Sequence, residues 1–382
     1  MPTDQTLPPE PALIYADSAR HPDLLYLTGL FCEDPFLWFS VNGSQHLAIS
    51  ELELGRARRT LPDAVEVLGL RQVRQAWKMA DKPSAPAAYI AAASRRFAVE
   101  KWHVPADFPL FLSLALQAQG IATEPVEAFC PQRKIKTPDE IAQIEVGVRL
   151  AEQGLQRGLE ILGEAEIGRR DRLQWRGRTL TAERLRGEIN AEIVRHGGLL
   201  SRTIVAPGRQ GADPHETGHG PIPAHQPLVL DIFPRVEASG YYGDLTRTVV
   251  KGQASAIVKQ AFAAVAAARE AAIAMIKPGV AACAVHERAA EILKQHGFAS
   301  GEQNGRHYGF FHGLGHGIGL ELHEAPRLTP GNENPLEHGD TVTVEPGLYY
   351  PEWGGLRLED VVAVSDCGCR NLTVAPTILE IA

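Results

Sequence analysis

Apolar residues recur with two different spacings along the first third of the chain. Short runs of β-forming residues predict strands, and the polar pair Asn42 and Gly43 predicts a hairpin turn between two of them. These predicted strands lie at residues 23–31, 35–41 and 46–50. Helical spacing of apolar residues predicts helices at residues 52–59 and 108–119. Residues 11–128 are therefore expected to form a compact α/β unit.

A helix start is the clearest local signal in the middle of the chain. Thr137 at the N-cap, Pro138 in the first turn and Glu140 three residues after the cap make a capping box. Apolar residues then repeat every three or four positions as far as Leu155, which predicts a long amphipathic helix. Further helices are predicted at residues 181–196, 254–276 and 280–296.

Four acidic residues stand within or at the ends of strands that are predicted in the second half of the chain. These strands are predicted at residues 227–231, 240–250, 340–345 and 356–364. The acidic residues are Asp231, Asp244, Glu345 and Glu359. Carboxylates are disfavoured in strands, and buried ones are costly unless they pair or bind a cation. Surface ion pairs are the alternative for each residue taken alone.

The segment from His312 to Glu324 concentrates candidate chemistry. It contains three histidines, His312, His316 and His323, and four glycines. Imidazole is a common metal ligand and proton carrier, and glycine lets the backbone approach a bound group closely. With His316, the four acidic residues make an oxygen-rich set of five ligands, whose four negative charges would balance two divalent ions. Such a set suits manganese, cobalt or zinc, and we favour manganese.

Composition and charge describe an ordinary globular protein. The 382 residues are 44% apolar and 22% charged, and this length suits two domains. The net charge of −8 argues against sequence-independent binding of nucleic acid, which needs a basic surface. No signal peptide is visible, and the longest apolar stretch, residues 261–276, is too short to span a bilayer. Five scattered cysteines suit a reducing compartment, so we expect a cytoplasmic protein without membrane contact.

Five separated motifs, in this order, resemble those of the pita-bread metallopeptidases, above all prolidase (Xaa-Pro dipeptidase) and aminopeptidase P. The motifs lie at residues 229–231, 243–248, 312–316, 344–347 and 357–360. The resemblance implies an α+β chain with two domains. A small α/β creatinase-type N-terminal domain, residues 1–130, precedes a pita-bread catalytic domain, residues 131–382, with a curved antiparallel sheet flanked by helices. One departure is the longer loop between Asp231 and Asp244, which puts the shape of the nearby pocket in question.

The resemblance also implies a role for each matching residue. The ligands of a dinuclear metal centre would be Asp231, Asp244, His316, Glu345 and Glu359, with Asp244 and Glu359 bridging the two ions. The catalytic residues would be His323, which contacts the scissile carbonyl, together with Glu345, His215 and Arg357. His312 would line the substrate pocket. His219 and His225 match nothing in the family and are expected to be surface or loop residues.

The implied activity is hydrolysis of the Xaa-Pro peptide bond by a prolidase-like exopeptidase that acts on proline-containing di- or oligopeptides, and a homodimer is expected. One alternative is an aminopeptidase P that acts on longer peptides. A methionine aminopeptidase is disfavoured by the extra N-terminal domain. Alternatives from another functional class are a metal-free pita-bread binding protein and a creatinase-like hydrolase. Such proteins typically lose metal ligands, whereas this chain has all five.

Overall fold

The computed structural model describes residues 8–79, 85–200 and 202–382. The chain divides into two compact units, Met1–Arg133 and Lys134–Ala382. The division falls between Arg133 and Lys134, whereas the sequence placed the domain boundary between residues 130 and 131. Each unit buries its own clusters of apolar side chains.

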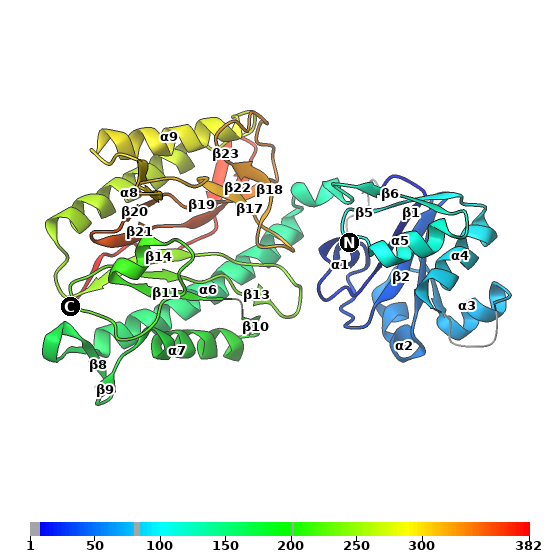
Figure 1. Ribbon diagram of the computed structural model, residues 1–382, viewed down its shortest axis with the longest axis horizontal. Coiled ribbons are helices and arrows are strands. Elements are labelled where there is room, and N and C mark those ends of the chain that lie inside the picture. Colours follow the sequence, from blue (N-terminus) through cyan, green and yellow to red (C-terminus); the bar gives the residue numbers. More distant parts are fainter. Residues whose placement is uncertain (1–7, 80–84, 201) are drawn as a thin grey trace. The chain divides into compact units, whose positions relative to one another are not determined.

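Unit 1 contains a six-stranded sheet in the order β4-β3-β2-β1-β5-β6 (Figure 1). Its strands are β1 (Ala12–Ala16), β2 (Phe36–Val41), β3 (Ser44–Ile49), β4 (Glu66–Gly69), β5 (Lys101–Pro105) and β6 (Ala122–Val126). Its helices are α1 (Pro22–Thr28), α2 (Glu51–Thr60), α3 (Leu70–Ala76), α4 (Pro86–Phe97) and α5 (Leu110–Gln117). The first three strands are antiparallel and β4, β5 and β6 join in parallel, so the sheet is mixed.

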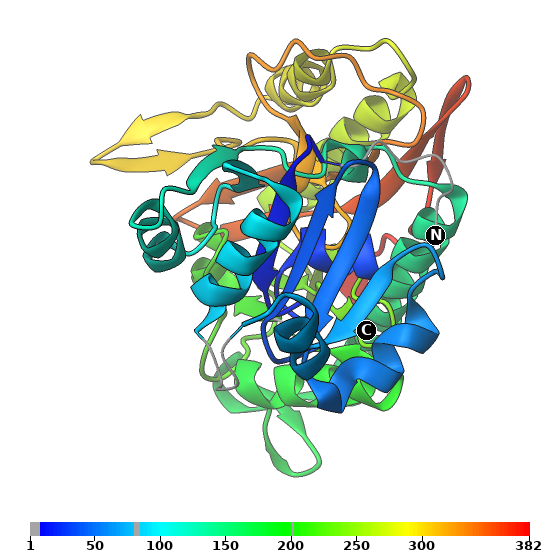
Figure 2. The same cartoon turned by 90° about the vertical axis from the view of Figure 1, so that its right-hand side faces the viewer.

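Helices cover both faces of this sheet. Side chains alternate between the two faces along each strand, so neighbouring residues belong to different apolar clusters. Leu13 and Phe39 pack with residues of α4 and α5 on one face. Ile14 and Trp38 pack with residues of α1 and α2 on the other face. Figure 2 shows the strands of this unit side by side with helices around them. The predicted hairpin is present, and both turn residues have positive φ, 54° at Asn42 and 74° at Gly43.

One predicted strand of unit 1 is wrong. Residues 23–31 are rich in β-formers, yet Pro22–Thr28 is helix α1. The local start signal prevails over β-propensity, since His21 caps the helix by accepting a hydrogen bond from the Leu24 N–H and Pro22 occupies the first turn. Gly29 ends the helix in the left-handed conformation.

Unit 2 begins with the predicted long helix, α6 (Pro138–Glu164). The capping box forms as predicted, because the Thr137 hydroxyl accepts from the Glu140 N–H while the Glu140 carboxylate accepts from the Thr137 N–H. The other three helices of this unit also match the sequence prediction. They are α7 (Ala182–Arg195), α8 (Ala256–Met275) and α9 (Ala282–Gln295).

Two larger sheets form the centre of unit 2. One has the order β11-β12-β14-β24 and contains β11 (Ile204–Pro207), β12 (Leu228–Asp231), β14 (Thr246–Lys251) and β24 (Glu380–Ile381). The other has the order β18-β17-β19-β22-β23 and contains β17 (Gly315–Gly317), β18 (Glu324–Leu328), β19 (Thr341–Val344), β22 (Asp360–Ser365) and β23 (Gly368–Asn371). All neighbours in these sheets are antiparallel except β14 and β24.

Shorter strands complete the unit. They are the pairs β20 (Gly347–Tyr350) with β21 (Gly354–Arg357), β15 (Gly301–Gln303) with β16 (Arg306–Tyr308), and β10 (Gly198–Leu199) with β13 (Arg235–Val236), and the small sheet of β7 (Glu166–Ile167), β8 (Leu173–Trp175) and β9 (Arg178–Thr179). The long loop after Asp231 therefore carries β13, which pairs with β10.

Pairs of helices cover the strands of unit 2 on opposite sides (Figure 1). Residues of α8 and α9 share one apolar core with β19, β20, β21 and β22. Residues of α6 and α7 share a second core with β11, β12 and β14. Because the two cores lie on either side of the strands, the acidic residues at the strand ends come to lie between them.

Two predicted strands differ from the structure in ways that matter for the acidic residues. The predicted strand at 356–364 is two strands, β21 and β22, and Glu359 lies in the break between them. The predicted strand at 240–250 begins only at Thr246, so Asp244 precedes β14 instead of lying within it. Both carboxylates therefore stand on irregular backbone next to a strand.

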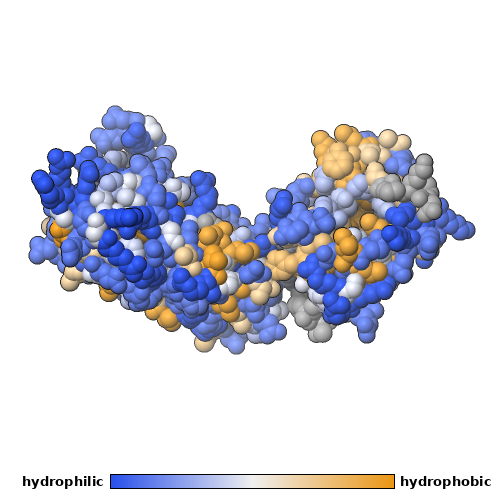
Figure 3. Space-filling view, turned by 90° about the horizontal axis from the view of Figure 1, so that it is seen from below, coloured by the Kyte–Doolittle hydropathy of each residue, from blue (hydrophilic) through white to orange (hydrophobic). Residues whose placement is uncertain are grey.

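Three exposed apolar side chains lie together on one short helix of unit 1. Leu110, Phe111 and Leu114 of α5 are 71%, 64% and 56% exposed. Apolar surface is visible on the same unit in Figure 3. Across the described residues, no helix is both long enough and apolar enough to cross a membrane.

The backbone of α6 lies directly against the segment that leads to Asp244. A Cβ on Gly147 would lie 2.5 Å from the Gly243 nitrogen, and a Cβ on Gly243 would lie 2.0 Å from the Gly147 carbonyl carbon. No L side chain fits at either position without a shift of the backbone. The two glycines therefore fix how close the helix and the Asp244 segment can come.

Two alanine substitutions in α6 test this contact. Gly147→Ala is expected to lower the free energy of unfolding by about 1–3 kcal/mol, because the added methyl group overpacks a backbone contact. Gly163→Ala is the matched control, since a Cβ there meets nothing within 4 Å. Its better helix propensity is expected to raise the stability by up to ~1 kcal/mol. Chemical denaturation of both variants measures the difference, and equal effects would contradict the close approach.

Candidate metal centre

One pocket of unit 2, with a volume of about 360 Å³, collects the chemistry-bearing residues from both larger sheets. All nine residues singled out in the sequence line it: His215, Asp231, Asp244, His312, His316, His323, Glu345, Arg357 and Glu359. His219 and His225 do not line it. Residues that are 144 positions apart in the chain thus face one cavity.

Three of these side chains lie close enough together to share one cation. A ligand atom from each of Asp244, His316 and Glu359 lies within 4.8 Å of the others, and all three residues are buried. His316 Nε2 is 3.7 Å from Asp244 Oδ2 and 3.3 Å from Glu345 Oε1. Within the described parts of the chain, no other group of His, Cys, Asp and Glu has this geometry.

Each acidic residue takes its place from the end of a strand. Asp231 ends β12 and Glu345 follows β19 directly. Asp244 lies two residues before β14, and Glu359 lies between β21 and β22. The Glu359 N–H donates to the Thr246 carbonyl at 3.0 Å, which ties the β21–β22 break to β14.

Burial and mutual repulsion make this cluster unfavourable in the absence of a cation. Burial, followed by the neighbouring carboxylates, raises the pKa of Asp244 and Glu359 well above the usual range. Burial raises the pKa of Glu345 to about 7, although the Arg357 guanidinium opposes the shift. Burial also lowers the pKa of His316 to about 3, so its imidazole is neutral and has a lone pair to offer a metal. Acidic oxygens with one neutral imidazole fit a divalent cation.

Arg357 is the cation that the protein itself supplies to this cluster. Its Nη2 donates to Asp231 Oδ2 at 2.6 Å, and its Nη1 donates to the Tyr349 hydroxyl at 2.8 Å. The guanidinium is buried, so its five N–H groups need such partners. Arg327 is the other guanidinium that lines this pocket, so the four carboxylates outnumber the arginines two to one.

Two threonines hold the carboxylates from behind. The Thr246 hydroxyl donates to Glu359 Oε2 at 2.7 Å and accepts from Arg357 Nε at 3.1 Å. The Thr343 hydroxyl donates to Glu345 Oε1 at 3.2 Å and accepts from the His316 N–H at 3.1 Å. These contacts restrict the rotation of Glu345 and Glu359, as partners of metal-binding carboxylates commonly do.

His312 is held as a neutral ring by its two hydrogen bonds. Its Nδ1 lies 2.7 Å from the Gly313 carbonyl and therefore carries the proton, while its Nε2 accepts from the Tyr349 hydroxyl at 3.1 Å. Burial, together with Arg357, lowers the pKa of His312 to about 4. Tyr349 thus links His312 to Arg357, although the sequence did not indicate this tyrosine.

The glycines between the histidines also have a structural reason within the sheet. A Cβ on Gly315 would lie 2.0 Å from the Thr343 carbonyl oxygen, and a Cβ on Gly317 would lie 2.2 Å from that of Ala325. Neither glycine has positive φ. Glycine is needed here because β17 lies between β18 and β19 with no room for side chains.

His215 and His323 approach the pocket from loops and are both exposed. The His323 ring stands edge-on to the His316 ring, with 4.3 Å between their centroids. Burial of part of the ring lowers the pKa of His323, which favours its neutral form. The His215 N–H donates to Asp213 Oδ1 at 3.0 Å within its loop.

Sequence reasoning missed several further pocket residues, among them Arg327, Ile204 and Phe233. Arg327 is exposed, and its guanidinium has no ion-pair partner among the described residues. A signal for it exists, since residues 323, 325 and 327 share one face by the period of two, and the even-numbered residues of β18 are buried. Ile204 and Phe233 add an apolar wall, which no motif marks.

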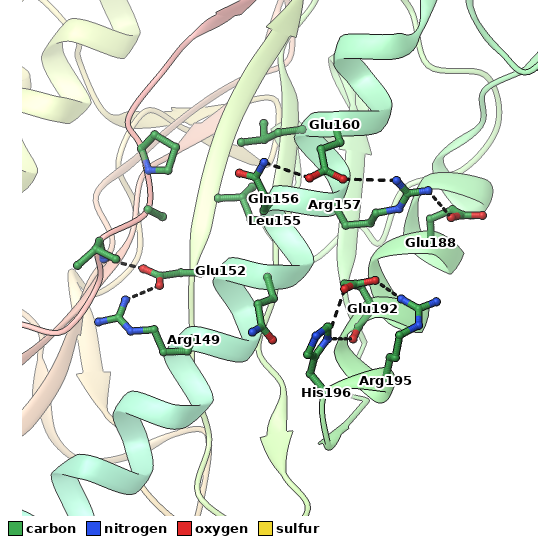
Figure 4. Close-up of a pocket in the computed structure, with 15 residues that line it drawn as sticks. Arg149, Glu152, Leu155, Gln156, Arg157, Glu160, Glu188, Glu192, Arg195 and His196 are labelled. Carbon is green, nitrogen blue, oxygen red and sulfur yellow. Dashed lines mark hydrogen bonds and ion pairs between the residues drawn. The ribbon is translucent and has the colours of Figure 1, made fainter.

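A second groove, with a volume of about 590 Å³, lies between α6, α7 and the segment at residues 374–376 (Figure 4). Its charged side chains are paired with one another. Arg157 contacts Glu160 and Glu188, and Arg149 contacts Glu152. The groove therefore presents satisfied ion pairs and no candidate chemistry.

Comparisons with known proteins agree with this geometry. The sequence pattern of metallopeptidase family M24 matches residues 142–366, which is more than half of the chain. A Xaa-Pro dipeptidase of Pyrococcus furiosus is 32% identical over 248 residues. That stretch covers 63% of this chain and 63% of the dipeptidase, so about a third of that relative is not matched.

Solved structures match over nearly the whole chain. A Xaa-Pro dipeptidase from Bacillus anthracis superimposes with a TM-score of 0.81 at 22% identity and covers 98% of this chain and 95% of its own. An X-Pro aminopeptidase from Thermotoga maritima has a TM-score of 0.80 at 21% identity, with 97% and 98% covered. The predicted α+β, pita-bread architecture is confirmed by these matches.

A melting experiment at two pH values tests whether the cluster binds a cation. The folded, metal-free protein holds a proton on Glu345 up to a pH of about 7, whereas the unfolded chain releases it near the usual value of 4.5. Metal-free stability is therefore expected to fall as the pH rises from 4.5 through 7. Added manganese competes with these protons and is expected to raise the melting temperature more at pH 8 than at pH 5.5.

The control for this experiment is Asp244→Asn, which removes a charge from the three-residue cluster and should abolish the metal-dependent rise. Calorimetric scans with manganese and with a chelator give the melting temperatures of the metal-loaded and metal-free protein. Identical melting temperatures with and without manganese at pH 8 would contradict a cation site.

Proposed function

Because the chain belongs to metallopeptidase family M24, we propose that it is a dinuclear-metal exopeptidase that hydrolyses Xaa-Pro dipeptides. One observation carries this proposal: four carboxylates, three of them buried, and one neutral histidine line a single pocket, together with an arginine that has no ion-pair partner among the described residues. The dipeptidase of Pyrococcus furiosus, with its matching sequence, supports the prolidase-like substrate class.

We assign the metal ligands to Asp231, Asp244, His316, Glu345 and Glu359. Asp244, His316 and Glu359 would hold one ion in common, since their ligand atoms lie within 4.8 Å of one another. Two divalent ions, with manganese favoured, would balance the four carboxylate charges that Arg357 alone does not. When bound, such ions supply Lewis acidity toward the scissile carbonyl and lower the pKa of a water molecule toward neutrality.

The surrounding residues supply proton transfer and positioning. Glu345 has one oxygen on the Thr343 hydroxyl and is placed to take a proton from the attacking water and deliver it to the leaving nitrogen. His323 is exposed at the pocket wall, so its N–H can donate to the carbonyl oxygen as negative charge develops there. A proline nitrogen has no N–H, and attack on the carbonyl needs none. Arg357 holds Asp231, and His215 and His312 line the substrate pocket.

Arg327 supports a dipeptide substrate over a longer peptide. Arg327 lies in β18 and lines the pocket with His323, which precedes that strand, and among the described residues its guanidinium has no acidic partner. A free C-terminal carboxylate directly after proline would fit such a group, since arginine binds carboxylates with two parallel hydrogen bonds. In an aminopeptidase P the chain would continue past this point, and the arginine would lose that partner.

The remaining alternatives rest on the fold alone. The match to an X-Pro aminopeptidase is at 21% identity, and both activities share this architecture. A metal-free binding protein or a creatinase-like hydrolase is disfavoured because all five ligand positions face one pocket. The homodimer, the cytoplasmic location and manganese stay predictions.

A substrate panel tests the proposed function. Ala-Pro, Ala-Pro-Pro and Met-Ala-Ser are compared at equal concentration after loading with manganese, cobalt or zinc. Cleavage of Ala-Pro with little cleavage of the other two is the expected outcome, and Glu345→Gln should abolish it while the protein stays folded. Preference for Ala-Pro-Pro would indicate an aminopeptidase P, and no cleavage of any peptide would overturn the proposal.

Arg327→Met tests the carboxylate contact separately. Loss of a charge-assisted pair costs roughly 1.5–3 kcal/mol, so KM for Ala-Pro is expected to rise about 10- to 100-fold. The matched control is a substrate, Ala-Pro amide, which lacks the carboxylate and should show little difference between the variant and the parent. Equal losses on both substrates would assign Arg327 a structural role instead.

A further inference from the structure

A buried ion pair lies directly behind the loop that carries His323. Lys136 Nζ is 2.8 Å from Glu324 Oε2, and the two side chains are only 1% and 6% exposed. Neither residue lines the substrate pocket. The pair joins positions 188 residues apart, and Glu324 follows His323 immediately.

The Glu324 carboxylate closes the turn that ends at His323. Its Oε1 accepts a hydrogen bond from the Glu321 N–H at 2.9 Å. Its Oε2 occupies the space that a side chain on Gly319 would need, since a Cβ there would lie 2.7 Å away. The Gly319 N–H donates to the Glu321 carbonyl at 3.1 Å, so the backbone folds around the carboxylate.

Lys136 offers this carboxylate a fixed partner. Its own N–H donates to the Gly339 carbonyl at 2.9 Å, and its Nζ also donates to the Lys134 carbonyl at 3.3 Å. The next residue is Thr137, the N-cap of α6. Both sides of the Lys136 backbone are thus anchored in unit 2.

His323 depends on its backbone for its position. Across the described residues its ring makes no side-chain hydrogen bond, and its ring contact is the edge-on approach to His316. Catalytic groups must be held to within about 0.5 Å of their working geometry. The turn closed by Glu324 is the element that can hold this ring there.

We propose that Lys136 and Glu324 form a positioning pair that sets His323 for catalysis. This inference rests on the proposed function, in which His323 donates to the substrate carbonyl. Without Lys136 the buried carboxylate loses the ammonium group that lies 2.8 Å from its Oε2, which weakens its hold on the Glu321 N–H and loosens the turn. His323 then samples several positions, and the transition state loses its hydrogen bond while the metal ligands stay in place.

Hydrogen exchange on Lys136→Met tests the turn without any need for activity. The amides of residues 319–324 are expected to exchange at least tenfold faster than in the parent protein, with or without added manganese. Lys134→Met is the matched control. Lys134 lies two residues before Lys136 and pairs with Glu337 and Asp340 instead of Glu324. Amide exchange at residues 319–324 should therefore not change in this variant.

Kinetics then test the route through His323. Lys136→Met is expected to lower kcat for Ala-Pro at least tenfold with KM within threefold, and Lys136→Arg should restore most of the rate. In a His323→Ala background, adding Lys136→Met should lower kcat by less than threefold, because the group it positions is already gone. A purely structural role would produce the full loss in both backgrounds.

The outcomes separate this inference from the proposed function. Parent protein that cleaves no Xaa-Pro substrate overturns the function, whereas the exchange result still tests the turn. Unchanged exchange at 319–324 in Lys136→Met, or additive losses with His323→Ala, overturns the positioning pair. If Lys136→Met does not fold, Glu324→Gln replaces it, since it keeps the side-chain shape while removing the charge from the pair.

Discussion

Repulsion among buried carboxylates is the constraint on which the catalytic unit depends. Asp231, Asp244, Glu345 and Glu359 are brought to one pocket. Burial and the neighbouring carboxylates raise the pKa of Asp244, Glu345 and Glu359 and so disfavour their charged forms. The protein offsets only part of this cost with Arg357 and with threonine hydroxyls. The repulsion that remains would be relieved by bound cations. The same cluster of carboxylates therefore shapes both the fold and the chemistry of the site.

Strand ends and helix pairs meet this constraint together. The two apolar cores pack against the strands from both sides. The carboxylates lie where the strands end or are interrupted. Glycines at positions 315 and 317 let three strands approach more closely than side chains allow. The result is a rigid frame in which acidic groups cannot move apart to relieve their repulsion.

Much of the fold and of the site could be predicted from the sequence. The predictions that were wrong or missing have physical causes. Capping at Thr137 and apolar spacing located the long helices correctly, because those signals are local. Residues 23–31 were predicted as a strand, but they begin within helix α1, because the cap at His21 outweighs their β-propensity. Tyr349 and Arg327 were missed since their importance arises from partners and strand faces that only the folded chain brings together. The crowding of the backbone at Gly315 and Gly317 could not be predicted, because it depends on how closely the folded strands lie.

The long reach of the Lys136–Glu324 contact bears on when the protein becomes active. Its two members are separated by 188 positions, and the last acidic group of the pocket, Glu359, is 23 residues from the end of the sequence. A chain emerging from the ribosome therefore has no assembled pocket until Glu359 has been made. A fragment that ends before Glu359 therefore contains only part of the acidic cluster, however well its own helices and strands form.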